Sequence, residues 1–181
     1  MLTDLFLELG VTHVVTVPDN TSAPLLLALE GTGLRASGPA IRVVYATREG
    51  EAVALASGLW VGGATPAVLI QNTGLLEAGD GLRGTASRMG APLLLLVTLR
   101  GYREAWRLGV DPGRGVRGRD DLVREELDTA ALMTEGTLRA WGIPFFHADD
   151  ASNLSPVRLA WAMAVEEQRP VAVLLDGILV P

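Results

Sequence analysis

The 181-residue sequence contains no cysteine, no lysine and only two histidines, and these absences exclude several kinds of chemistry. Without cysteine there can be no disulfide and no thiol nucleophile, and the isolated His13 and His147 do not form a zinc-binding pattern. All 15 basic residues are arginine, which excludes Schiff-base catalysis and a phosphate-loop lysine. Thiol, zinc and lysine-dependent catalysis are therefore ruled out.

The sequence also lacks a long apolar run and an excess of positive charge. Its longest apolar run, residues 91–99, is far shorter than the roughly 18 to 20 residues that span a bilayer. The N-terminal MLTDLFLELG has no basic region, which opposes a secretory signal. The net charge of −6 opposes nucleic-acid binding, because phosphate contacts need concentrated positive charge. We expect a cytoplasmic protein that binds neither membranes nor nucleic acid.

Length and composition favour one domain over residues 1–181. Hydrophobic residues make up 49% of the chain, so we expect part of its apolar surface to meet another chain. Apolar β-branched runs alternate with segments of helical period, which indicates a mostly parallel α/β sheet with helices on both faces. The six strands are predicted at 11–17, 41–46, 66–71, 92–98, 144–148 and 171–176. The helices are predicted at 2–9, 22–30, 49–61, 77–89, 122–141 and 155–168.

Segment 100–121 is rich in glycine and arginine, has no periodicity, and is predicted to be a long surface loop. In open α/β sheets, ligands bind outside the carboxyl ends of the strands. The stretches to consider are therefore VPDNTSAP, TREGE, QNTGLLEAGDG and LRGYRE, which follow the first four strands.

Two carboxylates, Glu49 and Glu51, begin the helix that follows the second strand. Acidic residues in a first turn interact favourably with the helix dipole, so a purely structural role is one interpretation. Residues two apart point in different directions around a helix, so at most one of the two faces a ligand.

Several motifs together resemble the pyrimidine-binding (PYR) domain of thiamine-diphosphate-dependent 2-oxo acid decarboxylases, in particular the phosphonopyruvate and sulfopyruvate decarboxylase group. They are VPDNTSAPLL (17–26), REGEAVALASG (48–58), LIQNTGL (69–75), PLLLLVTLRG (92–101) and GIPFF (142–146). The resemblance implies the thiamine-diphosphate-binding fold, thiamine diphosphate as cofactor, and decarboxylation of a 2-oxo acid.

The resemblance also implies roles for individual residues. The family's glutamate at the position of Glu49 contacts N1′ of the cofactor's aminopyrimidine and shares a proton with it, while Glu51 is left to cap the helix. The QNTGL stretch implies cofactor contacts by Asn72, Thr73, Gly74 and Leu75; a plain strand-to-helix turn is the alternative. The chain then departs from the family's Gly-Leu-Gly-Asn run, since Leu76 and Glu77 replace its last two residues.

Asp19, Asn20 and Arg48 are the candidate substrate-binding residues. Asp19 and Asn20 could hydrogen-bond a substrate or could shape an Asx turn that caps the next helix. The Arg48 guanidinium suits an oxyanion, as in the sulfopyruvate enzymes, although a lone arginine is often only a solvated charge. Segment 100–121 could cover the site and attract an anionic substrate, or be a variable surface loop.

No metal ligand is assigned to this chain. GDG at 79–81 begins like the family's magnesium motif but lacks the Asn-Asn that completes it, since the only asparagines are Asn20, Asn72 and Asn153. The resemblance therefore implies an α subunit that works with a separate diphosphate-binding (PP) β subunit, which binds Mg²⁺ and the diphosphate. Self-association is also expected. The substrate class is a sulfopyruvate- or phosphonopyruvate-like acid; the alternatives are a thiamine-diphosphate enzyme subunit with an unrelated substrate and a non-catalytic α/β module.

Overall fold

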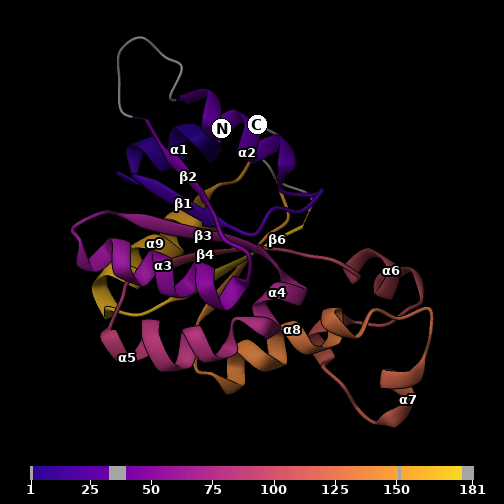
Figure 1. The fold of residues 1–181 in the computed structure, drawn as a ribbon. Coiled ribbons are helices and arrows are strands. Elements are labelled where there is room, and N and C mark those ends of the chain that lie inside the picture. The colour runs from indigo at the N-terminus through magenta and orange to yellow at the C-terminus, as the bar shows by residue number, and fades with distance from the viewer. Residues whose placement is uncertain (1, 33–39, 151, 177–181) are drawn as a thin grey trace.

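The chain builds one six-stranded sheet in which all neighbouring strands run parallel (Figure 1). The structure is a computed structural model that describes residues 2–32, 40–150 and 152–176. The strands are β1 (His13–Thr16), β2 (Arg42–Tyr45), β3 (Pro66–Gln71), β4 (Leu94–Thr98), β5 (Phe145–Ala148) and β6 (Val171–Leu175). Their order is β2-β1-β3-β4-β6-β5. The predicted six-stranded α/β fold is confirmed, with every described strand pair parallel rather than most of them.

The central strands are apolar on both faces, and this explains why they form a parallel sheet. Side chains alternate along a strand, so Leu94 packs in one hydrophobic cluster and Leu95 in the other. The same alternation separates Val14 from Val15 in β1. A sheet buried on both sides needs a layer of helices on each face.

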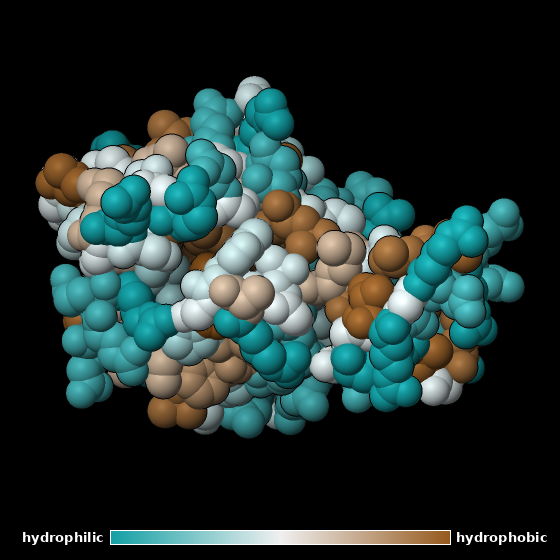
Figure 2. All heavy atoms as spheres, turned by 90° about the horizontal axis from the view of Figure 1, so that it is seen from below, coloured by the Kyte–Doolittle hydropathy of each residue, from teal (hydrophilic) through white to brown (hydrophobic). Residues whose placement is uncertain are grey.

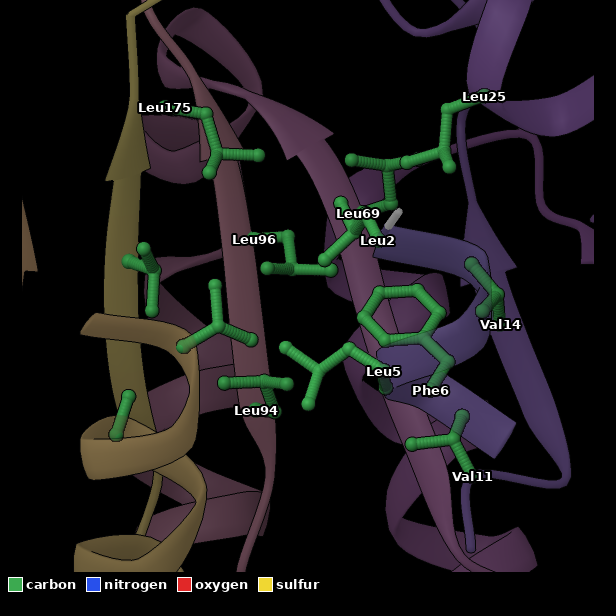
Figure 3. Packing of buried hydrophobic residues seen from close by; sticks show 14 of the residues in the cluster. Leu2, Leu5, Phe6, Val11, Val14, Leu25, Leu69, Leu94, Leu96 and Leu175 are labelled. Atoms are coloured by element: carbon green, nitrogen blue, oxygen red, sulfur yellow. The ribbon is translucent and has the colours of Figure 1, made fainter. Parts of the chain in front are cut away.

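Two helical layers cover the sheet (Figure 1). One contains α1 (Leu2–Glu8), α2 (Ala23–Thr32) and α9 (Ser155–Glu167). Figure 3 shows how Leu5 and Phe6 of α1 approach Leu69 and Leu96 of the sheet. The second layer contains α3 (Glu49–Val61), α4 (Asn72–Glu77), the π-helical η1 (Gly81–Ala86) with its continuation α5 (Ser87–Met89), and α8 (Thr129–Ala140). No helix within the described ranges is long and apolar enough to cross a membrane.

The helix predicted at 77–89 begins earlier than expected, because α4 starts at Asn72 directly after β3. Glycines at 74, 79 and 81 lower the helix propensity of this stretch, which is why the sequence favoured a turn there. Between Gly81 and Ala86 the helix widens to a π-helix, a form that occurs often at functional sites. QNTGL is therefore mostly the first turn of a helix and not a loop.

The predictions for residues 100–141 need two corrections. Segment 100–121 is not a loop without structure, since it contains α6 (Tyr102–Arg107), the 3₁₀ turn η2 (Pro112–Arg114) and the start of α7 (Arg119–Val123). The helix predicted at 122–141 is divided, because residues 124–128 are not helical and Asp128 caps α8 by accepting a hydrogen bond from the Ala130 N–H at 3.0 Å. Residues 102–126 together are called the arm.

The arm projects from the end of the sheet at which β4 finishes, on the right of Figure 1. Two contacts organise it: a small cluster of Ala105, Leu127 and Leu132, and an ion pair in which Arg114 Nη2 lies 2.6 Å from Asp121 Oδ1. The Arg114 guanidinium lowers the pKa of the Asp121 carboxyl to about 2. Figure 2 shows apolar residues among hydrophilic ones on this part of the surface. The large exposed apolar side chains of the arm are Trp106, Leu108, Val116, Leu122 and Val123.

Candidate functional site

The four stretches singled out in the sequence leave the sheet along one edge. In the strand register Thr16 is paired with Tyr45, and Gln71 with Thr98, so β1 and β2, and likewise β3 and β4, end side by side. Since all four strands are parallel neighbours, their following segments gather at the carboxyl end, where open α/β sheets bind ligands.

Glu49 is the first residue of α3, and its half-buried side chain lies directly against Gly74 of α4. A Cβ atom added at Gly74 would be 2.2 Å from Glu49 Oε1 and 2.4 Å from its Cγ. No hydrogen bond or ion pair joins the Glu49 carboxylate to any other residue that the structure describes. Contact with Gly74 therefore restricts the orientation of the Glu49 side chain, while its carboxylate oxygens remain free to bind a ligand.

Glu51, two residues further on, has a different role. Its Oε2 accepts hydrogen bonds from the Thr47 hydroxyl at 2.7 Å and from the Thr47 N–H at 2.9 Å. The Thr47 hydroxyl, followed by backbone N–H groups at the start of α3, holds the pKa of the Glu51 carboxyl below its usual value. This arrangement agrees with the expectation that the second carboxylate caps the helix.

Arg48, predicted to bind substrate, forms an ion pair with Glu77. Its Nη2 lies 2.9 Å from Glu77 Oε1, and its Nε donates to the same oxygen at 3.0 Å. The Arg48 side chain is 74% exposed, so the rest of its guanidinium remains accessible to an anion.

Asn72 lies beneath the site rather than facing it. Its amide oxygen accepts from the Arg100 N–H at 3.0 Å, and its Nδ2 donates to the Arg100 carbonyl at 3.0 Å and to Thr134 Oγ1 at 3.2 Å. The residue is fully buried, and both amide hydrogens are in use. The predicted side-chain contact between Asn72 and the cofactor conflicts with this geometry, because the amide joins the ends of β3 and β4 to α8.

Replacing Asn72 by Ala is expected to lower the free energy of unfolding by about 2 kcal/mol, since the Arg100 backbone groups would lose their partner. Urea unfolding measures the change. Thr73→Ala is the matched control: within the described ranges the exposed Thr73 hydroxyl bonds only the Gln71 side chain, so its effect should stay within about 0.5 kcal/mol. An N72A protein of unchanged stability but weakened cofactor binding would instead place the amide at the cofactor.

The remaining predicted cofactor residues, Thr73, Gly74 and Leu75, differ in how exposed they are. Thr73 is exposed at the edge, and Gly74 is buried under Glu49. Leu75 is completely buried in the core between the sheet and α3. Its side chain turns inward, so a contact of Leu75 with the cofactor would have to come from its backbone, and that contact stays a prediction.

At the end of β1, Asp19 forms the turn that was one of its two interpretations. Asp19 Oδ1 accepts from the Thr21 N–H at 2.6 Å and the Ser22 N–H at 3.1 Å, just before α2. Its Oδ2 is buried and has no hydrogen-bond partner in the described structure. Asn20 is exposed beside it. Both residues lie at the carboxyl edge, and contact with a substrate stays a prediction.

Ion pairs engage part of the arginines of segment 100–121. Arg100 pairs with Asp128 at 2.9 Å, Arg103 with Asp176 at 3.4 Å and Arg114 with Asp121 at 2.6 Å. Among the described residues no ion pair involves Arg117 or Arg119, and attraction of an anionic substrate to this segment stays a prediction. Across the part of the chain that the structure describes, no group of three or more His, Asp or Glu is arranged to hold a metal ion.

Glu77 belongs to the site but was not predicted from the sequence. It appeared only as a departure from the family pattern, yet its Oε2 accepts a hydrogen bond from the Gly50 N–H at 2.6 Å. The sequence does contain a signal, because Gly74, Glu77 and Gly81 follow the i, i+3, i+7 spacing of one helix face.

Comparison with known families identifies the chain. Residues 1–116, more than half of the sequence, match the family described as thiamine pyrophosphate enzyme, N-terminal TPP binding domain. The chain belongs to this family. Thiamine pyrophosphate is another name for thiamine diphosphate, so the resemblance stated from the motifs is confirmed, as is the relation to the phosphonopyruvate decarboxylase group.

Two curated relatives of this family member are phosphonopyruvate decarboxylases from Streptomyces. The proteins from S. viridochromogenes and S. hygroscopicus are 36% and 34% identical over 93 residues, which is 51% of this chain and 22% of each relative. The chain thus spans about a fifth of the length of these relatives. A solved benzoylformate decarboxylase from Polynucleobacter necessarius shares the fold, with a TM-score of 0.60 and 23% identity over 96% of this chain and 28% of that protein.

The residues around Glu49 fit the aminopyrimidine end of the cofactor that the family name implies. A half-buried carboxylate without an internal partner is available to hydrogen-bond a ring nitrogen, and the exposed Thr73 lies at the same edge.

Proposed function

We propose that the chain forms the pyrimidine-binding side of a thiamine-diphosphate-dependent 2-oxo acid decarboxylase, with Glu49 as the residue that activates the cofactor. The single observation that carries the proposal is the Glu49 carboxylate, which is half-buried at the carboxyl edge of the sheet and has no partner among the described residues. The neighbouring Glu51 and Glu77 are both engaged in hydrogen bonds. Glu49 is thus the carboxylate of the three that is free to exchange a proton with a ligand.

The proposed role of Glu49 is proton transfer at its carboxyl oxygens. A carboxylic acid there donates a proton to a ring nitrogen, and the carboxylate takes it back, as a general acid and base does. Gly74 lies against the side chain and keeps the carboxyl oriented toward the edge. Glu51 accepts the hydrogen bond of the Thr47 N–H just before α3, so Glu49 is not needed to cap the helix. The cofactor, when bound, supplies a thiazolium ring that accepts the electron pair released with carbon dioxide.

A small anionic 2-oxo acid, phosphonopyruvate-like or sulfopyruvate-like, is the proposed substrate. Support comes from the two relatives, which are phosphonopyruvate decarboxylases, and from the accessible part of the Arg48 guanidinium. A guanidinium can bind phosphonate or sulfonate oxygens with paired hydrogen bonds. Asp19 and Asn20 are proposed to line the same end of the site.

The proposed partner is a diphosphate-binding domain on a separate chain, which contributes Mg²⁺ and the diphosphate site. The outer side of α3 supports an interface: a groove of about 650 Å³ is lined there mainly by small or apolar residues, including Ala54, Leu55 and Gly58. A helix that is apolar on all sides is normally covered. The groove includes Glu51, in the same first turn of α3 as Glu49, so a chain covering it would reach the turn that bears the proposed catalytic carboxylate.

The function is tested by purifying the tagged chain from its own host with thiamine diphosphate and Mg²⁺ and identifying the associated proteins by mass spectrometry. We expect a partner with a Gly-Asp-Gly to Asn-Asn motif, and we expect the complex to release carbon dioxide from an anionic 2-oxo acid. Light scattering of the purified chain measures self-association. Recovery of the chain alone, with no cofactor bound, would favour a non-catalytic module; activity only on other 2-oxo acids would favour an unrelated substrate.

A further inference from the structure

The GLLEAGDG stretch, which departs from the family pattern, forms one continuous contact face against the start of α3. Gly74, Glu77 and Gly81 are spaced so that they lie on one side of the helical segment. All three meet the first two residues of α3, Glu49 and Gly50. The departure is therefore an organised surface in this protein and not a degraded loop.

The two glycines of this face allow a close approach of the two helices. At Gly74 an added Cβ would lie 2.2 Å from Glu49 Oε1, as described above. At Gly81 an added Cβ would lie 2.9 Å from the Gly50 carbonyl oxygen and 3.3 Å from Val53 Cβ. Any side chain at either position would push α3 or its first side chain away.

Glu77 lies between Gly74 and Gly81 in the sequence and supplies the polar contact with the start of α3. Its Oε2 accepts from the Gly50 N–H at 2.6 Å, one of the N–H groups at a helix start that have no partner within their own helix. Its Oε1 lies 2.9 Å from Arg48 Nη2. The same carboxylate thus binds the residue before Glu49 and the residue after it.

We propose that Glu77 is a positioning residue for Glu49, which fixes the first turn of α3 against α4 so that the Glu49 carboxylate keeps its orientation. This inference rests on the proposed function, in which Glu49 activates the cofactor. Arg48 has a second role here, because its positive charge compensates the negative charge that Glu77 brings close to the start of α3. Where the family's run has asparagine, this chain has the Glu77 carboxylate, which accepts a hydrogen bond and has Arg48 as its counter-ion.

The test compares Glu77→Ala with Glu77→Gln in the assembled enzyme and in the full chain without ligands. Ala removes both contacts, whereas Gln keeps an oxygen that can accept from the Gly50 N–H. We expect Ala to speed hydrogen exchange of the Gly50 amide about fivefold or more, as loss of a capping contact does. We expect kcat to fall about ten- to hundredfold with KM little changed, because the catalytic group is misplaced rather than the substrate. Glu77→Gln should keep both the Gly50 exchange rate and kcat close to their wild-type values.

Asp80→Ala is the matched control, since Asp80 lies three residues after Glu77 and, among the described residues, pairs only with Arg83. We expect wild-type exchange at Gly50 and wild-type kcat for this variant. Unchanged Gly50 exchange and unchanged kcat in the Glu77→Ala protein would overturn the proposal, as would equal losses in the Asp80→Ala protein. The exchange measurement needs neither cofactor nor substrate, so it judges the role of Glu77 even if Glu49→Gln shows that Glu49 is not the activator.

Discussion

Replacing Glu49 by Gln is expected to reduce kcat by about three orders of magnitude or more, the scale of general acid-base catalysis, while the complex with its partner still assembles. Gln has nearly the same size and keeps an oxygen, so it should still pack against Gly74. It cannot exchange a proton at neutral pH, and that is the property the proposed function requires. Steady-state kinetics together with size-exclusion chromatography measure activity and assembly separately.

The neighbouring Glu51→Gln variant is a matched control, because it makes the same chemical change two residues away. The Glu51 side chain accepts hydrogen bonds from the Thr47 hydroxyl and N–H, and the Gln oxygen can accept them too. We expect turnover within about threefold of wild type and a loss of stability below about 1 kcal/mol. Full turnover in the Glu49→Gln protein would eliminate Glu49 as the activator, and equal losses in both variants would indicate a general effect on the start of α3.

The fold could be predicted because its signals are local. A strand buried on both faces has a continuous apolar run, as in residues 92–98, and a residue-by-residue scan finds such runs. The start of α4 was missed because the glycines of this stretch argue against a helix, whereas in the structure Gly74 and Gly81 serve close packing against α3. The short helices of the arm were missed because segments of five or six residues show too few turns for a helical period to stand out in the sequence.

The site could be predicted only in part, since the sequence does not reveal which polar groups satisfy one another. Glu49 was predicted from its place after a strand and from the motifs around it, and its role stays a prediction. Asn72 was assigned to the cofactor from the QNTGL motif, because the sequence does not show that its amide bonds Thr134, 62 residues away along the chain. Glu77 was overlooked for the same reason, since Gly50 is 27 residues away. Contacts between distant residues decide whether a side chain supports a site or faces the ligand.

Gly74→Ala should separate catalysis from stability more sharply than any change in the core. The new methyl group would lie 2.2 Å from Glu49 Oε1 and 2.5 Å from its Cδ, so the Glu49 side chain must turn away. The clash involves a flexible side chain and not backbone, and Ala favours a helix over Gly by about 1 kcal/mol, so the fold should persist. We expect kcat to fall about a hundredfold or more, because displacement of a catalytic group by about 1 Å costs that much.

Gly136→Ala is the control for this substitution, since Gly136 lies in α8 with no atom within 4 Å of an added Cβ. It should preserve kcat and raise stability slightly. The decisive comparison is the double variant Gly74→Ala, Glu49→Gln. If Gly74 acts through Glu49, the double variant is no slower than Glu49→Gln alone. If the two losses multiply, Gly74 has a separate role, such as allowing its backbone to approach the cofactor, and the orientation of Glu49 does not depend on it.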